Sequence, residues 1–316
     1  MTTRMMRALQ AIVPGGLKVV DVPMPDVRRG EILVEVVCSA LNGMDAEVLD
    51  GHWGRYARRW SKQGVTLTGF EFSGVARSDG VSIRAGQRVI GYSHVLHGHR
   101  THCQFVAMPE CDLQPFPEHL SFEEAAALVV GGLTSIQILE RIRPLRGGQR
   151  CLIVGANGAV GLYCVQLALS QGAQVVALAA PQHFEALRAM GVHELLDSRD
   201  QRAWKSISAF DLIIDTPPLM HYAQARHMLA GNGTYVSSHP EQDLLAPLRS
   251  LLSTRKAGWL MLLRGNRELF QRLAKLAEQK VLRPSVDSVF TLDEAAQAFV
   301  LVRSSGRFGR VLLRMT

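Results

Sequence analysis

The sequence contains a glycine-rich turn at residues 155–161, GANGAVG, whose composition and spacing could bind a phosphate group. The apolar run at 151–154 before it predicts a buried strand, and apolar residues recur at helical spacing after it. A helix that begins at such a turn directs N–H groups and its positive dipole end toward an anion. Gly158 and Gly161 match the last two positions of G-x-G-x-x-G, with Ala156 in the first. The predicted dinucleotide site comprises Gly155, Ala156, Asn157, Gly158, Ala159, Val160 and Gly161.

The segments around this turn predict a parallel sheet covered by helices. From residue 149 onward, short apolar runs alternate with segments of helical apolar spacing. Strands are expected at 150–154, 174–179, 211–215 and 233–238, and helices at 160–171, 183–190 and 220–230. Gly172 and Gly191 stand where helices commonly end. This alternation is typical of a doubly wound α/β domain.

The first 110 residues have a different pattern, in which strand-like runs are separated by glycine and proline. Strands are expected at 7–13, 17–22, 31–38, 71–77 and 87–92, which together favour a partly open β-barrel. Ser121 and Glu124 form a capping-box pattern before an alanine-rich helix, and a second helix is expected at 133–141. Further on, the sequence predicts a strand at 256–263, a helix at 267–279 and a strand–helix–strand segment at 288–315.

The composition is that of a packed globular protein. With 35 basic and 28 acidic residues the net charge is +7, but the basic residues are scattered, which favours a small anionic ligand over nucleic acid. The five cysteines form no C-x-x-C pair, which is typical of reduced thiols. No signal-peptide core is present, and no apolar run approaches the ~20 residues of a membrane helix. We therefore expect a cytoplasmic protein with no nucleic-acid or membrane partner.

Several segments, taken in order, carry a resemblance to a known family. They are residues 30–36 (GEILVEV), 40–42 (ALN) with Asp45, 69–75 (GFEFSGV), 85–89 (AGQRV), 132–134 (GLT) and the glycine turn. In this order they resemble the medium-chain dehydrogenase/reductase superfamily, and within it the zinc-free quinone oxidoreductase group. The resemblance implies a GroES-like partly open β-barrel domain at 1–120 and 266–316. It also implies a Rossmann dinucleotide-binding domain, a doubly wound parallel sheet, at 121–265.

The resemblance also bears on metal binding. Zinc-dependent relatives place a cysteine where this chain has Asn42 and a histidine where it has Phe70, and neither replacement can ligate zinc in the same way. We therefore expect no zinc. A separate candidate metal site is a cluster of four histidines and one cysteine. This cluster either binds a metal or is a polar loop that happens to be rich in histidine. Its members are His94, His97, His99, His102 and Cys103.

The expected cofactor is NADPH rather than NADH. NAD-binding relatives carry an acidic residue after the second strand of the nucleotide domain, where this chain has Ala180. His183 and Ser198 stand where NADPH-dependent relatives have Lys and Tyr, and Arg199 could pair with a 2′-phosphate. The alternative is that His183 only begins a helix and Arg199 is solvated. Ser237, at the end of a later predicted strand, completes the expected cofactor set.

The expected catalytic residues are Asn42, Asp45 and Thr134. Thr134 resembles the position that contacts the nicotinamide, and Asn42 is either a donor to a substrate carbonyl or a turn residue. Glu47 and the pair Pro217-Pro218 depart from the family pattern. The expected reaction is hydride transfer to a small quinone or α,β-unsaturated carbonyl substrate. The alternatives are an enoyl reductase acting on a thioester and a non-enzymatic nucleotide-binding or structural protein. The apolar strand at 256–263 predicts a homodimer.

Overall fold

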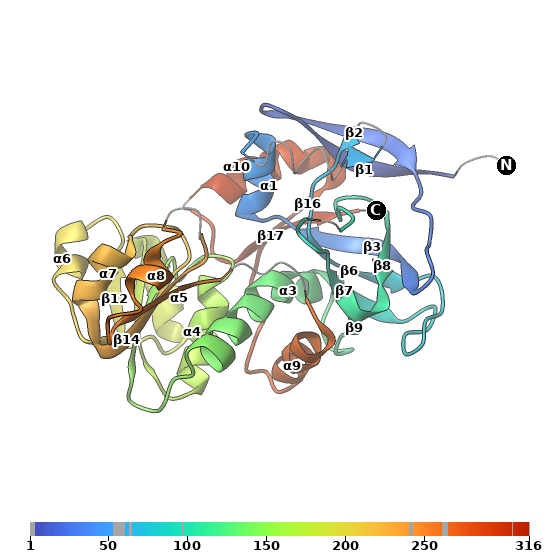
Figure 1. Cartoon of the computed structure of the whole chain (residues 1–316). Coiled ribbons are helices and arrows are strands. Elements are labelled where there is room, and N and C mark those ends of the chain that lie inside the picture. Colours follow the sequence, from blue (N-terminus) through green and yellow to red (C-terminus); the bar gives the residue numbers. More distant parts are fainter. Residues whose placement is uncertain are drawn as a thin grey trace. The chain divides into compact units, whose positions relative to one another are not determined.

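The structure is a computed structural model that describes residues 4–52, 61–62, 65–96, 98–239, 243–260, 265–304 and 306–315. The chain divides into two compact units (Figure 1). The first unit comprises Met1–Val130, Leu263–Glu278 and Pro284–Thr316, and the second comprises Gly131–Leu262 and Gln279–Arg283. The division falls inside helix α3 (Phe122–Ile136), because the early part of this helix packs within the first unit, where Ala126 is buried against Cys38 and Leu312.

The first unit is built on a mixed seven-stranded sheet with the order β16-β17-β3-β6-β7-β9, in which β8 also pairs with β3. Its strands are β3 (Glu31–Ala40), β6 (Glu71–Ala76), β7 (Arg88–Tyr92), β8 (Phe105–Pro109), β9 (Leu113–Pro115), β16 (Val286–Thr291) and β17 (Arg310–Arg314). A separate hairpin is formed by β1 (Met5–Ile12) and β2 (Gly16–Pro23), and a small one by β4 (Ser61–Lys62) and β5 (Val65–Thr66). The last strand, β17, pairs antiparallel with β3, so the end of the chain completes the sheet begun near its start (Figure 1).

The second unit is a six-stranded parallel sheet with the order β12-β11-β10-β13-β14-β15. Its strands are β10 (Arg150–Val154), β11 (Gln174–Ala179), β12 (Glu194–Asp197), β13 (Phe210–Asp215), β14 (Leu229–Ser237) and β15 (Lys256–Trp259). The strand order reverses between β10 and β13, which is the position where doubly wound sheets bind their ligands. The predicted α/β fold is therefore confirmed, and so are the four strands predicted after residue 149.

The remaining helices connect these strands. They are α1 (Gly43–Leu49), α4 (Gly161–Ser170), α5 (Phe184–Ala189), α6 (Gln201–Lys205), α7 (Tyr222–Met228), α8 (Ala246–Arg249), α9 (Arg267–Glu278) and α10 (Ala295–Arg303). Short 3-10 turns lie at η1 (Glu110–Asp112), η3 (Pro181–His183) and η5 (Leu292–Glu294). Gly172 and Gly191 follow α4 and α5 with φ of 75° and 94°, which confirms both predicted helix ends. Strand β15 begins as predicted, and residues 261–264 lie outside the described part of the chain.

The helix that spans residues 122–142 differs from its prediction. The capping box forms, since Ser121 N donates to Glu124 Oε2 at 2.8 Å and Glu124 N to Ser121 Oγ at 3.1 Å. The expected break before residue 133 is wrong, because α3 continues without interruption into the π-helix η2 (Gln137–Ile142). Gly131, within α3, allows close packing, because a Cβ added there would lie 2.2 Å from the carbonyl oxygen of Ala159.

This same helix also corrects the expectation that no apolar segment reaches membrane length. Over Phe122–Ile142 it is long and apolar enough to cross a membrane by length and composition. However, 72% of the apolar window is buried inside the protein, as in a core helix.

Candidate functional site

The glycine turn between β10 and α4 depends on two glycines for its shape. Gly155 has φ of +74°, and its N–H donates to the Leu178 carbonyl oxygen at 3.0 Å. A Cβ on Gly155 would lie 2.5 Å from Pro217 Cδ, and one on Gly161 would lie 2.1 Å from the Gly155 carbonyl oxygen. Helix α4 can therefore begin against the end of β10 only when both residues lack a side chain.

The middle of the turn leaves space for a ligand. Gly158 donates its N–H to the Gly155 carbonyl at 2.9 Å, and a Cβ added to Gly158 would meet the protein no closer than 3.2 Å. Packing therefore restricts residue 158 much less than residues 155 and 161, whereas a phosphate group that approaches the backbone favours glycine there. Ala156 is fully buried, so its methyl group points into the core and the departure from G-x-G-x-x-G is accommodated by packing. The turn fits a pyrophosphate.

The ends of β11 and β12 lie side by side, with Ala179 opposite Asp197. Ser198 N donates to the Ala179 carbonyl at 3.0 Å, which fixes the segment after β12 against the end of β11. Strand β12 and Asp197 were missed in the sequence, because this short strand is only half buried along its length. His183 is buried in the 3-10 turn that follows β11.

The carboxyl ends of β13 and β14 lie on the side of the glycine turn opposite β11. Thr216 Oγ1 donates to the Val154 carbonyl at 2.9 Å, and Pro217 packs against Gly155, so the departure at Pro217-Pro218 lies directly on the glycine turn. Ser237 pairs with Asp215 across the two strands and accepts the N–H of His239 at 3.1 Å. The glycine turn, Ser237 and the end of β11 thus share the carboxyl edge of one sheet.

Asp215 is fully buried beneath this loop. Its carboxylate accepts the N–H groups of Leu219 at 3.2 Å and Met220 at 3.0 Å and the hydroxyl of Tyr235 at 3.1 Å. Burial raises the pKa of Asp215 to about 6, although these three donors act in the opposite direction.

The raised pKa of Asp215 predicts a pH-dependent stability. An unfolded aspartate has a pKa near 3.9, so between about pH 4 and pH 6 the folded state binds more protons than the unfolded state. The contribution of the Asp215 carboxyl group to the free energy of unfolding is therefore complete below about pH 4 and is lost as pH rises through about 6. Relative to Asp215→Asn, the native protein should lose on the order of 2–3 kcal/mol of unfolding free energy between these limits. Urea titrations at several pH values measure this, and parallel pH profiles for the two proteins would contradict it.

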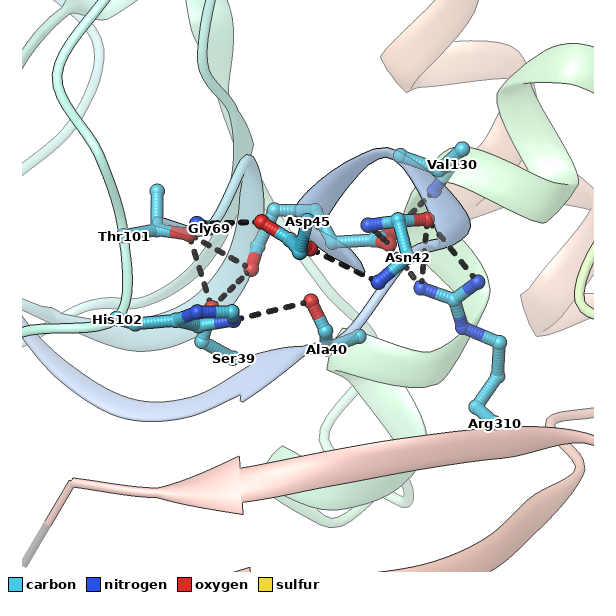
Figure 2. Close-up of polar contacts among 10 residues, drawn as sticks. Ser39, Ala40, Asn42, Asp45, Gly69, Thr101, His102, Val130 and Arg310 are labelled. Carbon is cyan, nitrogen blue, oxygen red and sulfur yellow. Dashed lines mark hydrogen bonds and ion pairs between the residues drawn. The ribbon is translucent and has the colours of Figure 1, made fainter. Parts of the chain in front are cut away.

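In the first unit, a polar cluster connects Asn42, Glu71 and Arg310. Figure 2 shows the contact between Asn42 and Arg310. The Asn42 amide nitrogen donates to Glu71 Oε1 at 2.8 Å, and the Asn42 amide oxygen accepts from Arg310 at 3.3 Å. Glu71 and Arg310 form an ion pair in which both side chains are 0% exposed. The second oxygen of Glu71 accepts the N–H of Val130 at 2.5 Å.

Glu71 and Arg310 were missed as a pair because 239 positions separate them in the sequence. The only signal is a glutamate within the apolar run 69–75. Burial raises the pKa of the Glu71 carboxyl, and the guanidinium of Arg310 is the largest opposing influence.

Asp45 lies in the first turn of α1 and is fully buried. Its two carboxylate oxygens accept the backbone N–H groups of Asn42 at 2.9 Å and Gly69 at 2.7 Å (Figure 2). We therefore assign Asp45 to positioning the Asn42 turn, rather than to contact with a substrate. Glu47 is half buried on the same helix.

Thr134, expected to contact the nicotinamide, belongs to the second unit and is buried in α3 at 5% exposure. It follows Gly131 by three residues and so lies on the same face of the helix, the face that approaches Ala159 in the glycine turn.

The residues at the expected zinc positions do not fit a zinc ion. Phe70 is buried, and the guanidinium of Arg100 lies 4.4 Å from its ring centroid, while the amide of Asn42 is bonded within the polar cluster. Among the histidines, His97 lies outside the described residues. The ring of His102 is buried and bonded to Thr68 Oγ1 at 2.8 Å. The described part of the chain contains no group of three His, Cys, Asp or Glu residues arranged to hold a metal.

Several known proteins are similar to this chain. A family model described as zinc-binding dehydrogenase matches residues 190–313. Quinone oxidoreductase of Rattus norvegicus is 25% identical, with 98% of each chain covered. The structure of the quinone oxidoreductase from Coxiella burnetii matches with a TM-score of 0.88 and 26% identity, over 99% of this chain and 100% of that one.

These findings support the medium-chain dehydrogenase/reductase superfamily, and within it the quinone oxidoreductase-like group. They also support an NAD(P)H-dependent oxidoreductase. The apo structure of JamJ enoyl reductase is also similar, with a TM-score of 0.82 and 25% identity over 99% of this chain and 100% of that one. The family-model match does not include residues 42 and 70, the positions that decide the zinc question.

Proposed function

We propose that this oxidoreductase is NADPH-dependent and zinc-independent, and that it reduces a quinone or an α,β-unsaturated carbonyl. The observation that carries the proposal is the turn built on Gly155, Gly158 and Gly161, which fits a pyrophosphate at the start of α4. Bound NADPH would supply the hydride. The preference for NADPH is supported by Ala180, which offers no carboxylate to a ribose hydroxyl, and by the nearby cation Arg199.

Zinc independence is supported by the side chains at positions 42 and 70. A buried phenyl ring offers no ligand atom, and an amide bonded to an ion pair is a poor substitute for a thiolate. The developing negative charge on the acceptor oxygen then needs a donor from the protein.

We assign this role to Asn42. Its amide nitrogen has two hydrogens, of which one is donated to Glu71. The second hydrogen can be donated to the acceptor oxygen, while the contact between Arg310 and the amide oxygen polarises the group toward stronger donation. Asp45 holds the Asn42 backbone, so the donor is fixed before the acceptor binds.

Asn42→Ala is expected to lower turnover roughly a hundredfold, because one lost oxyanion donor typically costs about 3 kcal/mol in the transition state. Affinity for NADPH should change less than about threefold, because Asn42 is not among the residues assigned to the pyrophosphate. Turnover and cofactor affinity are measured separately, and thermal unfolding controls for damage to the cluster. Native turnover in a folded variant would remove Asn42 from the mechanism.

A second candidate function is reduction of an enoyl thioester, favoured by the similarity to JamJ enoyl reductase. The two candidates share the cofactor site and differ only in the acceptor. A spectrophotometric screen of NADPH and NADH oxidation against quinones, enones and enoyl thioesters distinguishes them. Tight NADPH binding without oxidation by any acceptor would instead favour a non-enzymatic protein.

We also propose that the protein is a homodimer. Within the described residues β15 pairs only with β14, so its other edge is open. Beside it lies an exposed leucine patch, formed by Leu244, Leu245, Leu248, Leu251 and Leu252. An open strand edge next to an exposed apolar patch is an association surface, and a second copy can cover both at once.

The double variant Leu248→Asp/Leu252→Asp is therefore expected to be monomeric at micromolar concentration, whereas the native protein is dimeric. Light scattering measures the mass of each. Val300→Asp, which changes an exposed apolar residue of the first unit, serves as the matched control and should leave the mass unchanged. A monomeric native protein would contradict the proposal.

A further inference from the structure

Arg199 is held by a carboxylate from its own strand end. Its Nε donates to Asp197 Oδ1 and its NH2 group to Oδ2, each at 3.1 Å, so the pair is bidentate. Asp197 Oδ1 also accepts the backbone N–H of Arg199 at 3.0 Å. The guanidinium therefore has a fixed partner although its side chain is 71% exposed.

The pair lies where the proposed cofactor's ribose would be recognised. Asp197 is opposite Ala179 in the sheet, and neighbouring strands lie ~5 Å apart. The bond from Ser198 N to the Ala179 carbonyl, at 3.0 Å, ties the residue between Asp197 and Arg199 to the end of β11. In doubly wound folds, the end of this second strand reads the ribose 2′ position.

We propose that Asp197 is a specificity-determining residue, which competes with the 2′-phosphate of NADPH for the guanidinium of Arg199. This inference rests on the proposed cofactor function. Asp197 occupies the Nε and NH2 edge of the guanidinium, so the 2′-phosphate either displaces this carboxylate or binds the remaining edge beside it. In both cases the negative charge of Asp197 repels the phosphate. NADPH therefore binds against the charge of Asp197, whereas NADH, which lacks the phosphate, leaves the pair intact.

Asp197→Asn removes the charge at nearly constant shape and is expected to tighten NADPH binding about fivefold, since exposed ion pairs are weak. Arg199→Gln is expected to weaken NADPH binding roughly tenfold, because charge-assisted hydrogen bonds are lost. Neither change should move the dissociation constant of NADH more than about twofold. In the double variant, the gain from Asp197→Asn should be largely lost, because the competition requires Arg199.

Dissociation constants are measured by cofactor fluorescence with the full-length protein, without any acceptor. The matched control is Glu194→Gln, which removes the acid of the Arg150–Glu194 pair at the opposite end of β12 and should leave both cofactors unaffected. Unchanged NADPH affinity in Asp197→Asn, or an equal gain for NADH, would overturn the competition while leaving the proposed function intact. Failure of the native protein to bind either cofactor would overturn both.

Discussion

Replacing Arg310 by methionine is expected to lower the free energy of unfolding by about 3–5 kcal/mol, because it leaves the charge of Glu71 buried without its partner. Both side chains are fully buried, so water cannot take the place of the guanidinium. The amide oxygen of Asn42 also loses the hydrogen bond that it now accepts from Arg310. Urea denaturation of the native and variant proteins measures the difference.

Two comparisons test whether the unpaired buried charge of Glu71 causes the loss of stability in Arg310→Met. Arg7→Met, which breaks the exposed pair with Asp293, should change stability by less than about 1 kcal/mol. Glu71→Gln combined with Arg310→Met should recover part of the loss, since no uncompensated charge then stays buried. Equal effects of Arg7→Met and Arg310→Met would contradict the importance assigned to the pair.

Gly161→Ala is expected to weaken NADPH binding roughly a hundredfold or more. The added methyl group would lie 2.1 Å from the Gly155 carbonyl oxygen, so the turn and the start of α4 must move apart. A displacement of about 1 Å is enough to lose such a factor when a ligand depends on aligned N–H groups. Cofactor fluorescence measures the affinity, and circular dichroism confirms that the variant is folded.

Two further glycine variants separate the site from general packing. In Gly158→Ala the added group meets one atom of the described residues, the Gly155 carbonyl oxygen at 3.2 Å, which a small shift relieves. This variant should therefore fold and still weaken NADPH binding through contact with the pyrophosphate. At Gly231, no atom of the described residues lies within 4 Å of an added Cβ, so Gly231→Ala should change neither fold nor affinity. Native NADPH affinity in folded Gly161→Ala would show that the turn does not hold the pyrophosphate.

Local patterns were sufficient to predict the glycine turn and the two elements that flank it. The strand before the glycine turn, the turn and the helix after it are consecutive in the chain, so their spacing appears directly in the sequence. Capping at Ser121 is local in the same way. The helix break expected before residue 133 was wrong for the opposite reason: Gly131 lets Ala159 approach the helix, and nothing near Gly131 in the sequence shows that contact.

The polar residues that matter most required the tertiary structure. Glu71 and Arg310 come from strands far apart in the chain, and only the pairing of β3 with both β6 and β17 brings them together. Asp197 was overlooked because its strand is short and half buried. A sequence pattern therefore predicted the strand, glycine turn and helix of the proposed cofactor site, but not the pair that restrains Arg199.

The proposed reaction is the transfer of a hydride from NADPH to an electron-poor acceptor without zinc. The most direct test uses NADPH with deuterium at both C4 positions, an α,β-unsaturated carbonyl acceptor and protein dialysed against a chelator, followed by mass spectrometry of the reduced acceptor. We expect deuterium on the β-carbon of the product, formed at a rate that the chelator does not change. Product with no deuterium on that carbon, or activity lost on chelation and restored by zinc, would contradict the proposal.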